Sequence, residues 1–310
     1  MSPEITKREN ITPRLAVIIN AGSGSADNAD NADLAAQVSA QFSARGIQPE
    51  FCSCAEGEVI RHHAEEALQR GCTIVVAGGG DGTVSTVASV VVGTDAALGI
   101  LPLGTLNHFA KDLGIPLDLN EAVATIIEGR VVQVDIGELN GRTFINNSSL
   151  GLYPKLVRHR DEHQRLGRSK WWAFFRAMLI VLGRYSFLKV RLSADEAKIV
   201  RSTPFVFIGN NEYEIQGFSI GTRARIDSGM LSVYLTHRAG RIRLFGLALR
   251  GLFGRLRDAV DFDTITTPEV MIDARSHSVQ VALDGELFQI ELPLHYRCRR
   301  QELRVIVREK

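Results

Sequence analysis

A carboxylate stands inside a glycine run at residues 78–83, Gly-Gly-Gly-Asp-Gly-Thr, directly after the apolar segment 73–77. Glycines let a backbone approach a ligand closely, and N–H groups at the start of a helix attract an anion. A carboxylate repels phosphates unless a cation bridges the two, so Asp81 predicts Mg²⁺ at a phosphate-binding loop. An ordinary Asp-Gly turn is the alternative, but it leaves the three preceding glycines unexplained.

This loop lacks both common nucleotide-binding signatures. Residues 78–83 do not fit Gly-x-Gly-x-x-Gly, and no Lys-Ser or Lys-Thr follows a glycine as in a P-loop. Without that lysine, backbone N–H groups and a metal ion must neutralise the phosphate charge. A second Gly-Thr pair, in LPLGTLNHFAKDLGIP at 101–116, also follows an apolar run and suggests a second loop of the same kind.

The composition is that of a large globular chain. Its 310 residues are 45% hydrophobic and carry a net charge of +1, which allows two domains and excludes polyanion binding by the molecule as a whole. Cys52, Cys54, Cys72 and Cys298 form no Cys-x-x-Cys pair and match neither a zinc site nor a disulfide framework. Reduced thiols in a cytoplasmic protein are therefore expected, and no signal-peptide pattern begins the chain.

The elements that must position the loops change in kind along the chain. Alternating strand and helix patterns predict an α/β domain with a parallel sheet over 1–137. Short alternating runs between Gly, Asn and Asp turns predict a mainly antiparallel β-sandwich domain over 138–310, with helical insertions at 155–183 and about 240–257 and a last strand that returns to the first domain. The strands expected in the first domain cover 15–20, 47–53, 73–77 and 97–102, and its helices cover 34–42, 60–68, 82–92 and 120–129.

Two basic, apolar segments are expected to be helices that contact a membrane. The segment 171–188 is interrupted by Arg176 and Arg184, whose charges disfavour a spanning helix. The segment 240–257 combines arginines with aliphatic residues. Solvated helix faces are the alternative, and nucleic acid could also use such surfaces, but the aliphatic content favours peripheral contact with an anionic membrane.

A rival signal lies at 159–163, His-Arg-Asp-Glu-His. It fits an inverted zinc-protease pattern, and it begins like the catalytic loop of a protein kinase. That kinase loop needs an asparagine five residues after Asp161, where Leu166 stands. The basic neighbours indicate a solvated helix face instead of a zinc site.

The motifs taken in order resemble the catalytic domain shared by diacylglycerol kinases and bacterial lipid kinases, with sphingosine and ceramide kinases as relatives. NAD kinases and phosphofructokinases share only the first glycine motif. NAGSG at 20–24 stands at the family's Asn-Pro-x-x-Gly loop. The later motifs are VDIG at 134–137, NNSSLG at 146–151, RIDSGMLSV at 225–233 and LDGE at 283–286.

The resemblance implies a site for ATP and Mg²⁺, with a lipid hydroxyl arriving in a cleft between the domains. Glu286 is the implied base that accepts the hydroxyl proton, with Asp284 second; an ordinary hairpin turn is the alternative. Asp135 is expected to complete the metal network of Asp81, or else to be a plain strand end. The residues assigned to ATP are Asn20, Gly22, Ser23, Gly24, Gly79, Gly80, Asp81, Gly82, Thr83, Val84, Ser85 and Thr105.

Three positions depart from the family's pattern. Asn107 and His108 stand where the family carries Asn-Asp, so an imidazole replaces a carboxylate. Cys54 stands where many relatives have a ligating threonine. At the structural Mg²⁺ site of bacterial relatives a serine replaces the aspartate, and Asp227 lies one position away. The residues matching that site are Arg225 and Met230, through their carbonyls, and Ser228.

We therefore expect an ATP- and Mg²⁺-dependent lipid kinase of phospholipid metabolism, acting on diacylglycerol or a similar lipid alcohol. It is expected to be cytoplasmic and peripherally membrane-associated, with no nucleic-acid partner, and homodimer formation stays open. A soluble kinase like NAD kinase and a non-catalytic, nucleotide-binding module at the membrane are the two alternatives.

Overall fold

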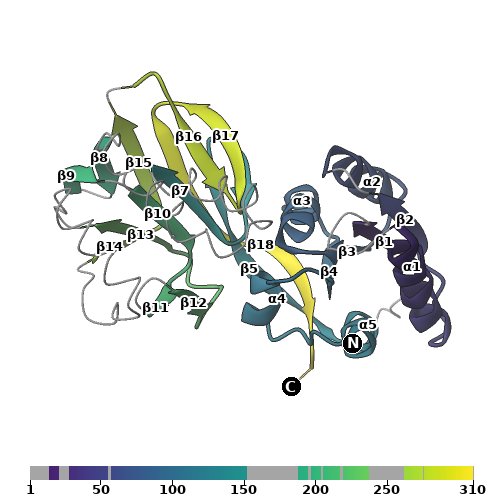
Figure 1. Ribbon diagram of the computed structural model, residues 1–310. Helices are drawn as coiled ribbons and strands as arrows, with labels where there is room; N and C mark the ends of the chain where they lie inside the picture. The colour runs from purple at the N-terminus through teal and green to yellow at the C-terminus, as the bar shows by residue number, and fades with distance from the viewer. Residues whose placement is uncertain are drawn as a thin grey trace, which may run out of the picture. The chain divides into compact units, whose positions relative to one another are not determined.

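The computed structural model describes residues 14–20, 28–54, 57–151, 188–194, 197–203, 205–216, 219–236, 262–274 and 276–309. The chain divides into two compact units (Figure 1), one formed by Met1–Thr105, Leu117–Val131 and Arg304–Lys310, the other by Leu106–Pro116 and Val132–Leu303. Strands β5 (Arg130–Leu139) and β18 (Leu294–Val307) contain residues of both units. The helical insertions expected at 155–183 and 240–257 lie outside the described residues.

The first unit is built on a parallel sheet with the strand order β2-β1-β3-β4-β18. Its strands are β1 (Leu15–Asn20), β2 (Glu50–Cys54), β3 (Ile74–Gly79), β4 (Ala97–Pro102) and the end of β18. Its helices are α1 (Asn28–Ser43), α2 (Gly57–Gln69), α3 (Asp81–Val91) and α5 (Leu119–Glu128). Because β2 and β3 lie on opposite sides of β1, the strand order reverses between β1 and β3.

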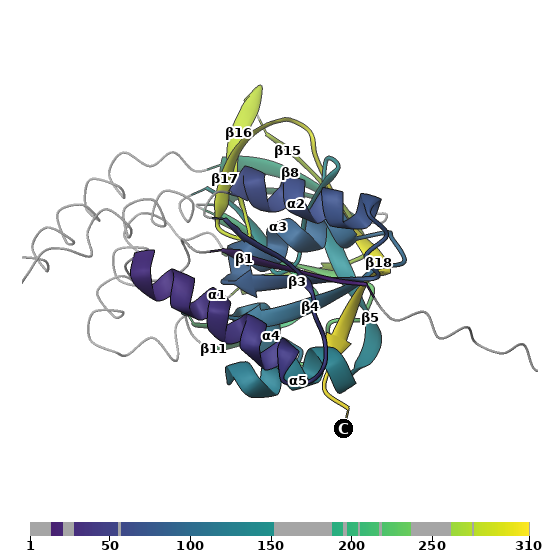
Figure 2. The ribbon, with the colours of Figure 1, turned by 90° about the vertical axis from the view of Figure 1, so that its right-hand side faces the viewer.

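Helices cover both faces of this sheet (Figure 2). Val38 and Phe42 of α1 and Val123 of α5 share one core with the inward side chains of β1, while α2 and α3 pack against each other on the opposite face. Strands β1 and β4 are buried almost along their whole length, as expected for a sheet covered on both sides. The predicted α/β domain with a parallel sheet is confirmed.

The second unit is an antiparallel β-sandwich, as predicted. One sheet has the order β14-β13-β10-β7-β16-β17, and the other has the order β18-β15-β8-β9. Leu150, Val206 and Val281 of the first sheet share a core with Leu192 and Tyr296 of the second. The bounds are β7 (Asn147–Gly151), β8 (Leu188–Ala194), β9 (Ala197–Thr203), β10 (Phe205–Asn210), β13 (Leu231–Thr236), β14 (Phe262–Thr267), β15 (Glu269–Ala274), β16 (Ser278–Leu283) and β17 (Glu286–Glu291).

Shorter elements carry the polar groups of the second unit. They are the helix α4 (His108–Asp112), the strand β6 (Arg142–Phe144) that pairs with β5, and the hairpin of β11 (Tyr213–Gln216) and β12 (Ser219–Arg223). Helix α4 contacts β12.

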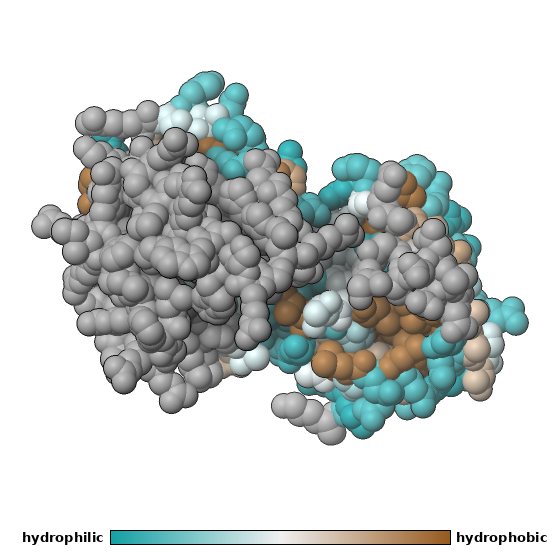
Figure 3. Space-filling model, viewed as in Figure 1, coloured by the Kyte–Doolittle hydropathy of each residue, from teal (hydrophilic) through white to brown (hydrophobic). Residues whose placement is uncertain are grey.

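The described surface is mixed in polarity. On the face drawn in Figure 3, hydrophilic residues surround an apolar area of the first unit. Within the part of the chain that the structure describes, no helix has the length and apolar character needed to cross a membrane. The segment 171–187 lies outside that part.

Candidate functional site

Three of the predicted nucleotide-binding segments follow neighbouring parallel strands. Asn20 is the last residue of β1, Gly79 ends β3, and the Gly-Thr pair at 104–105 comes shortly after β4. Ligands of open α/β sheets bind beyond the carboxyl ends of the strands, at the point where the strand order reverses. Since that point lies between β1 and β3, the fold brings these segments to the edge where a ligand is expected.

Gly79 is required by a close contact with Thr83. A Cβ atom at Gly79 would lie 2.5 Å from Thr83 Oγ1 and 2.7 Å from Thr83 Cβ. The same hydroxyl oxygen accepts a hydrogen bond of 3.0 Å from Asn20 Nδ2. The end of β1 and the start of α3 are therefore held together, and a side chain at Gly79 would separate them.

Gly80 precedes α3 and contacts the second glycine loop. It is extended, with φ of −85°, and has no side chain to cap the N–H groups of the first helical turn. A Cβ atom placed on it would lie 3.5 Å from Gly104 Cα, and the Leu103 N–H donates to the Gly79 carbonyl at 3.1 Å. The two loops are therefore adjacent, and the positive end of the α3 dipole faces the edge of the sheet.

The remaining residues predicted for this site surround these two loops. Asp81 and Gly82 are half-buried at the start of α3, Thr83 and Val84 are buried, Ser85 is half-buried, and Thr105 is exposed. Cys54 ends β2, and burial raises the pKa of its thiol to about 11, so it stays protonated at neutral pH. The predicted residues Gly22, Ser23 and Gly24 lie outside the described part of the chain.

In the second unit, Asp284 is a hydrogen-bond acceptor for three backbone groups. It forms a two-residue turn with Gly285 between β16 and β17, and both have positive φ, 46° and 93°. Its carboxylate accepts the N–H groups of Ile145, Asn146 and Asn147 at 2.8, 2.8 and 3.0 Å. The turn is thus fixed to the segment 145–147, while Glu286 beside it is exposed.

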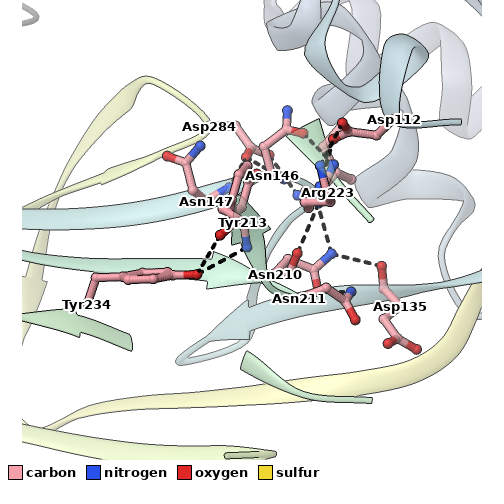
Figure 4. A network of polar contacts seen from close by, with 11 residues as sticks. Asp112, Asp135, Asn146, Asn147, Asn210, Asn211, Tyr213, Arg223, Tyr234 and Asp284 are labelled. Atoms are coloured by element: carbon pink, nitrogen blue, oxygen red, sulfur yellow. Dashed lines mark hydrogen bonds and ion pairs between the residues drawn. The ribbon is translucent and has the colours of Figure 1, made fainter. Parts of the chain in front are cut away.

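The same segment is held from its other side by Arg223, which the motifs did not reveal (Figure 4). Arg223 Nη1 donates to the carbonyls of Ile145 and Asn210 at 2.8 and 3.1 Å, and Nη2 donates to Asn146 Oδ1 at 2.9 Å. Its Nε atom pairs with Asp112 Oδ2 at 2.7 Å, and these two side chains are only 0% and 3% exposed. The one sequence signal is an arginine at the end of a short strand.

Asp135 on β5 is buried and also accepts backbone hydrogen bonds. Its Oδ2 accepts the Gly229 N–H at 2.5 Å, and its Oδ1 accepts the Gln301 N–H at 2.9 Å. A metal ion would have to compete with these two donors, so the metal role of Asp135 stays a prediction. Asp81 belongs to the other unit.

Two residues at the predicted structural Mg²⁺ site, Ser228 and Met230, make hydrogen bonds with Asn211, and the metal site stays a prediction. The Ser228 hydroxyl and N–H both donate to Asn211 Oδ1, and the Met230 carbonyl accepts the Asn211 N–H at 3.0 Å. Arg225 pairs with Asp227 at 3.1 Å, and these two side chains are 70% and 44% exposed. Among the described residues no group of three His, Cys, Asp or Glu side chains could hold a metal ion. Asn211 therefore holds this loop, as an acceptor for Ser228 and as a donor to Met230.

Asn107 and His108 lie in the second unit. Asn107 is buried in the left-handed conformation with φ of 50°, and it precedes α4. His108, the first residue of α4, is exposed, and the other end of this helix carries Asp112. The departure at His108 therefore places an imidazole on the surface of the second unit.

Comparison with known proteins agrees with the fold and the motifs. The diacylglycerol kinase catalytic domain family matches residues 14–139, and the YegS C-terminal NAD kinase beta sandwich-like domain matches residues 153–307. A "Probable lipid kinase YegS-like" of Enterobacter sp. (strain 638) is 41% identical over 271 residues, 79% of this chain and 83% of that protein. A protein of the same name from Pseudomonas aeruginosa PAO1 is 30% identical, covering 83% and 84% of the two chains.

A more distant relative and a solved structure extend this result. The diacylglycerol kinase of Bacillus subtilis (strain 168) is 28% identical over 81% of this chain and 83% of its own length. A crystal structure of a diacylglycerol kinase from Bacillus anthracis str. Sterne matches with a TM-score of 0.66 and 18% identity, covering 95% and 96% of the two chains, which supports the fold. The chain belongs to the diacylglycerol kinase family of lipid kinases.

The two glycines of the β3 loop should respond differently to a methyl group. Gly79→Ala is expected to lose about 1–3 kcal/mol of unfolding free energy, because its Cβ would overlap Thr83. Gly80→Ala, with ordinary contact distances, should change stability by less than about 0.5 kcal/mol yet weaken ATP binding. Urea denaturation and calorimetric ATP titration measure the two effects. A Gly80→Ala protein with unchanged ATP affinity would contradict a phosphate-binding role of this loop.

Two carboxylates of the β16–β17 hairpin should also differ in their contribution to stability. Asp284→Asn is expected to lower the unfolding free energy by about 2 kcal/mol, because an amide replaces a charged acceptor of three N–H groups. Glu291→Gln, at the exposed end of β17, is the matched control and should change it by less than about 0.5 kcal/mol. Equal and small losses in urea denaturation would mean that the three hydrogen bonds contribute little.

Proposed function

We propose that this chain transfers the γ-phosphate of ATP to the hydroxyl group of diacylglycerol or a similar lipid alcohol, with Mg²⁺ bound at the phosphates. The observation that carries the proposal is the close approach of the two glycine loops at the ends of adjacent parallel strands: a Cβ atom on Gly80 would lie 3.5 Å from Gly104 Cα. The family supports a lipid as the acceptor, since its named members are lipid and diacylglycerol kinases.

Backbone groups would bind most of the ATP phosphate charge in this proposal. No lysine or arginine occurs in 78–86 or in 101–110. N–H groups at the start of α3 are suited to hold the phosphates. Asp81, in the first turn of α3, offers oxygen ligands of the kind that Mg²⁺ prefers. Bound Mg²⁺ would neutralise charge on the phosphates.

Glu286 is the proposed base of the transfer. As the lipid hydroxyl oxygen bonds to the γ-phosphorus, the bond from that phosphorus to the leaving oxygen of ADP breaks, and Glu286 takes the hydroxyl proton. Glu286 is exposed, as access to a substrate hydroxyl requires. Asp284 is the second candidate, and both of its oxygens accept backbone N–H groups. Proton transfer of this kind contributes ~10²–10⁴-fold to a rate.

Access to a lipid substrate requires contact with a membrane surface. The basic, apolar segments 171–187 and 240–257 would supply it, and both lie outside the described residues. Peripheral binding to an anionic membrane is therefore part of the proposal and rests on the sequence alone. Anionic vesicles should bind this chain more weakly as salt rises, because salt screens such attraction.

The test compares acceptors in parallel. The purified chain is incubated with γ-labelled ATP and Mg²⁺, and with diacylglycerol in mixed micelles, a total phospholipid extract, or NAD. Label is expected in the organic phase as a lipid phosphate. Asp81→Asn is expected to lose this labelling, because its carboxylate is proposed to ligate the metal. Thermal unfolding of the variant, measured in parallel, shows that it is folded.

Two outcomes would overturn the proposal. Label transferred to NAD and to no lipid would identify a soluble kinase of the NAD kinase type. ATP binding in titration without label in any acceptor would identify a non-catalytic nucleotide-binding module.

A further inference from the structure

A buried ion pair connects helix α4 with the segment that fixes the Asp284 turn. Asp112 ends α4, and its Oδ1 and Oδ2 atoms accept the backbone N–H and the Nε–H of Arg223 at 3.1 and 2.7 Å. Arg223 ends β12, more than a hundred residues away in the chain. The helix that follows the second Gly-Thr loop is therefore tied to β12 by a charged pair excluded from solvent.

Each of the three nitrogen atoms of the Arg223 guanidinium group donates at least one hydrogen bond. Beyond Asp112, the guanidinium group donates to the carbonyls of Ile145 and Asn210 and to the side chain of Asn146 (Figure 4). It also lies 5.6 Å from the ring centroid of Phe109 and 5.2 Å from that of Tyr213. A guanidinium with so many directional contacts has one position and one orientation.

Segment 145–147 is thus held from two sides. Its carbonyl and side-chain oxygens accept hydrogen bonds from Arg223, and its three N–H groups donate to Asp284. Asp284 begins the turn from which Glu286 emerges. A continuous path of short polar contacts therefore runs from α4 through Arg223 and 145–147 to Asp284, two residues before the proposed base.

Packing alone does not account for this pair. Burying two charges carries a desolvation penalty that their attraction often fails to exceed, and apolar residues of similar volume usually stabilise a core as well or better. The pair does what apolar residues cannot: it fixes the direction of the groups around it. A displacement of a reacting group by about 1 Å can lower a rate by roughly a hundredfold, so a fixed orientation of the groups around the proposed base would affect the rate of phosphoryl transfer.

We propose that Arg223 is a positioning residue for phosphoryl transfer, acting with Asp112 to hold the Asp284–Glu286 turn in place. This inference rests on the proposed function and on Glu286 as the base. Arg223 touches neither substrate in this account. It acts through Asn146 and Asp284, and its effect should reach the rate through Glu286.

A double-mutant cycle in the full chain tests this route. Arg223→Lys, Glu286→Gln and the double variant are assayed with saturating ATP and diacylglycerol micelles. Arg223→Lys is expected to lower kcat by roughly 10–100-fold, within the range for a misplaced reacting group, and to leave the KM for ATP unchanged. In the Glu286→Gln background it should cause no further loss, because residues that act as a unit are not additive.

The results separate this inference from the proposed function. If Arg223→Lys lowers kcat by the same factor with and without Glu286, the arginine supports the scaffold in general and the positioning role is wrong. If Glu286→Gln keeps the full rate, the base assignment fails, and with it the route assigned to Arg223. If no lipid is phosphorylated at all, the proposed function fails first.

Two further variants keep the test decisive if Arg223→Lys does not fold. Asn146→Ala removes one acceptor of Arg223 and leaves the backbone N–H to Asp284 in place, so a smaller, several-fold loss of kcat with the same non-additivity is expected. Equal losses in both backgrounds would contradict the proposal. Arg297→Lys is the matched control, since Arg297 pairs with Glu138 at 2.7 Å and its side chain is 52% exposed; its kcat should be unchanged.

Discussion

The proposed binding of ATP phosphates without a lysine in the loop is the constraint that explains the first unit. Backbone N–H groups must then come close to the ligand, and only a backbone without side chains at those positions allows this approach. Gly79 is needed because Thr83 packs onto it, whereas a Cβ atom at Gly80 would meet only an ordinary contact with Gly104, so the need for Gly80 is proposed to come from the ligand. The carboxyl ends of adjacent parallel strands bring such loops together. The strand order and the glycine positions therefore both allow backbone N–H groups to approach the proposed phosphates.

The second unit is organised by a different interaction, in which charged side chains hold backbone groups. Asp284, Asp135 and Arg223 together bind N–H groups and carbonyls of turns and strand ends. Each contact fixes an irregular segment that the sandwich core does not cover. In the same way Asn211 holds the loop at Ser228, where relatives were expected to use a metal ion. We read these side chains as the means by which an otherwise apolar sandwich keeps polar loops in defined positions.

The sequence predicts the regular parts of this fold well, because they depend on local patterns. Burial on both faces makes β1 and β4 continuous apolar runs, and the Asp-Gly pair at 284–285 is suited to the two-residue turn that the structure contains. The glycine loops were recognisable because each is a short contiguous motif, and their phosphate-binding role is a proposal. The fold class and the family were both predicted from such motifs and are confirmed.

The contacts between distant residues could not be predicted in this way. Asp112 and Arg223 stand 111 positions apart, and nothing near either residue indicates that they meet in a buried pair. Asp284 illustrates the same limit, because its spacing fits a turn or a base, and only its partners 137 to 139 positions away show that it binds three N–H groups. The roles of Gly22, Ser23 and Gly24, and of the basic segments, stay predictions.

The central proposal is that one phosphoryl group moves from ATP to a lipid hydroxyl. Phosphorus NMR of a reaction containing the purified chain, ATP, Mg²⁺ and diacylglycerol micelles measures that transfer directly. We predict a phosphomonoester signal in the lipid fraction that grows in a one-to-one ratio with ADP. ADP and free phosphate that accumulate without a lipid phosphomonoester would contradict the account.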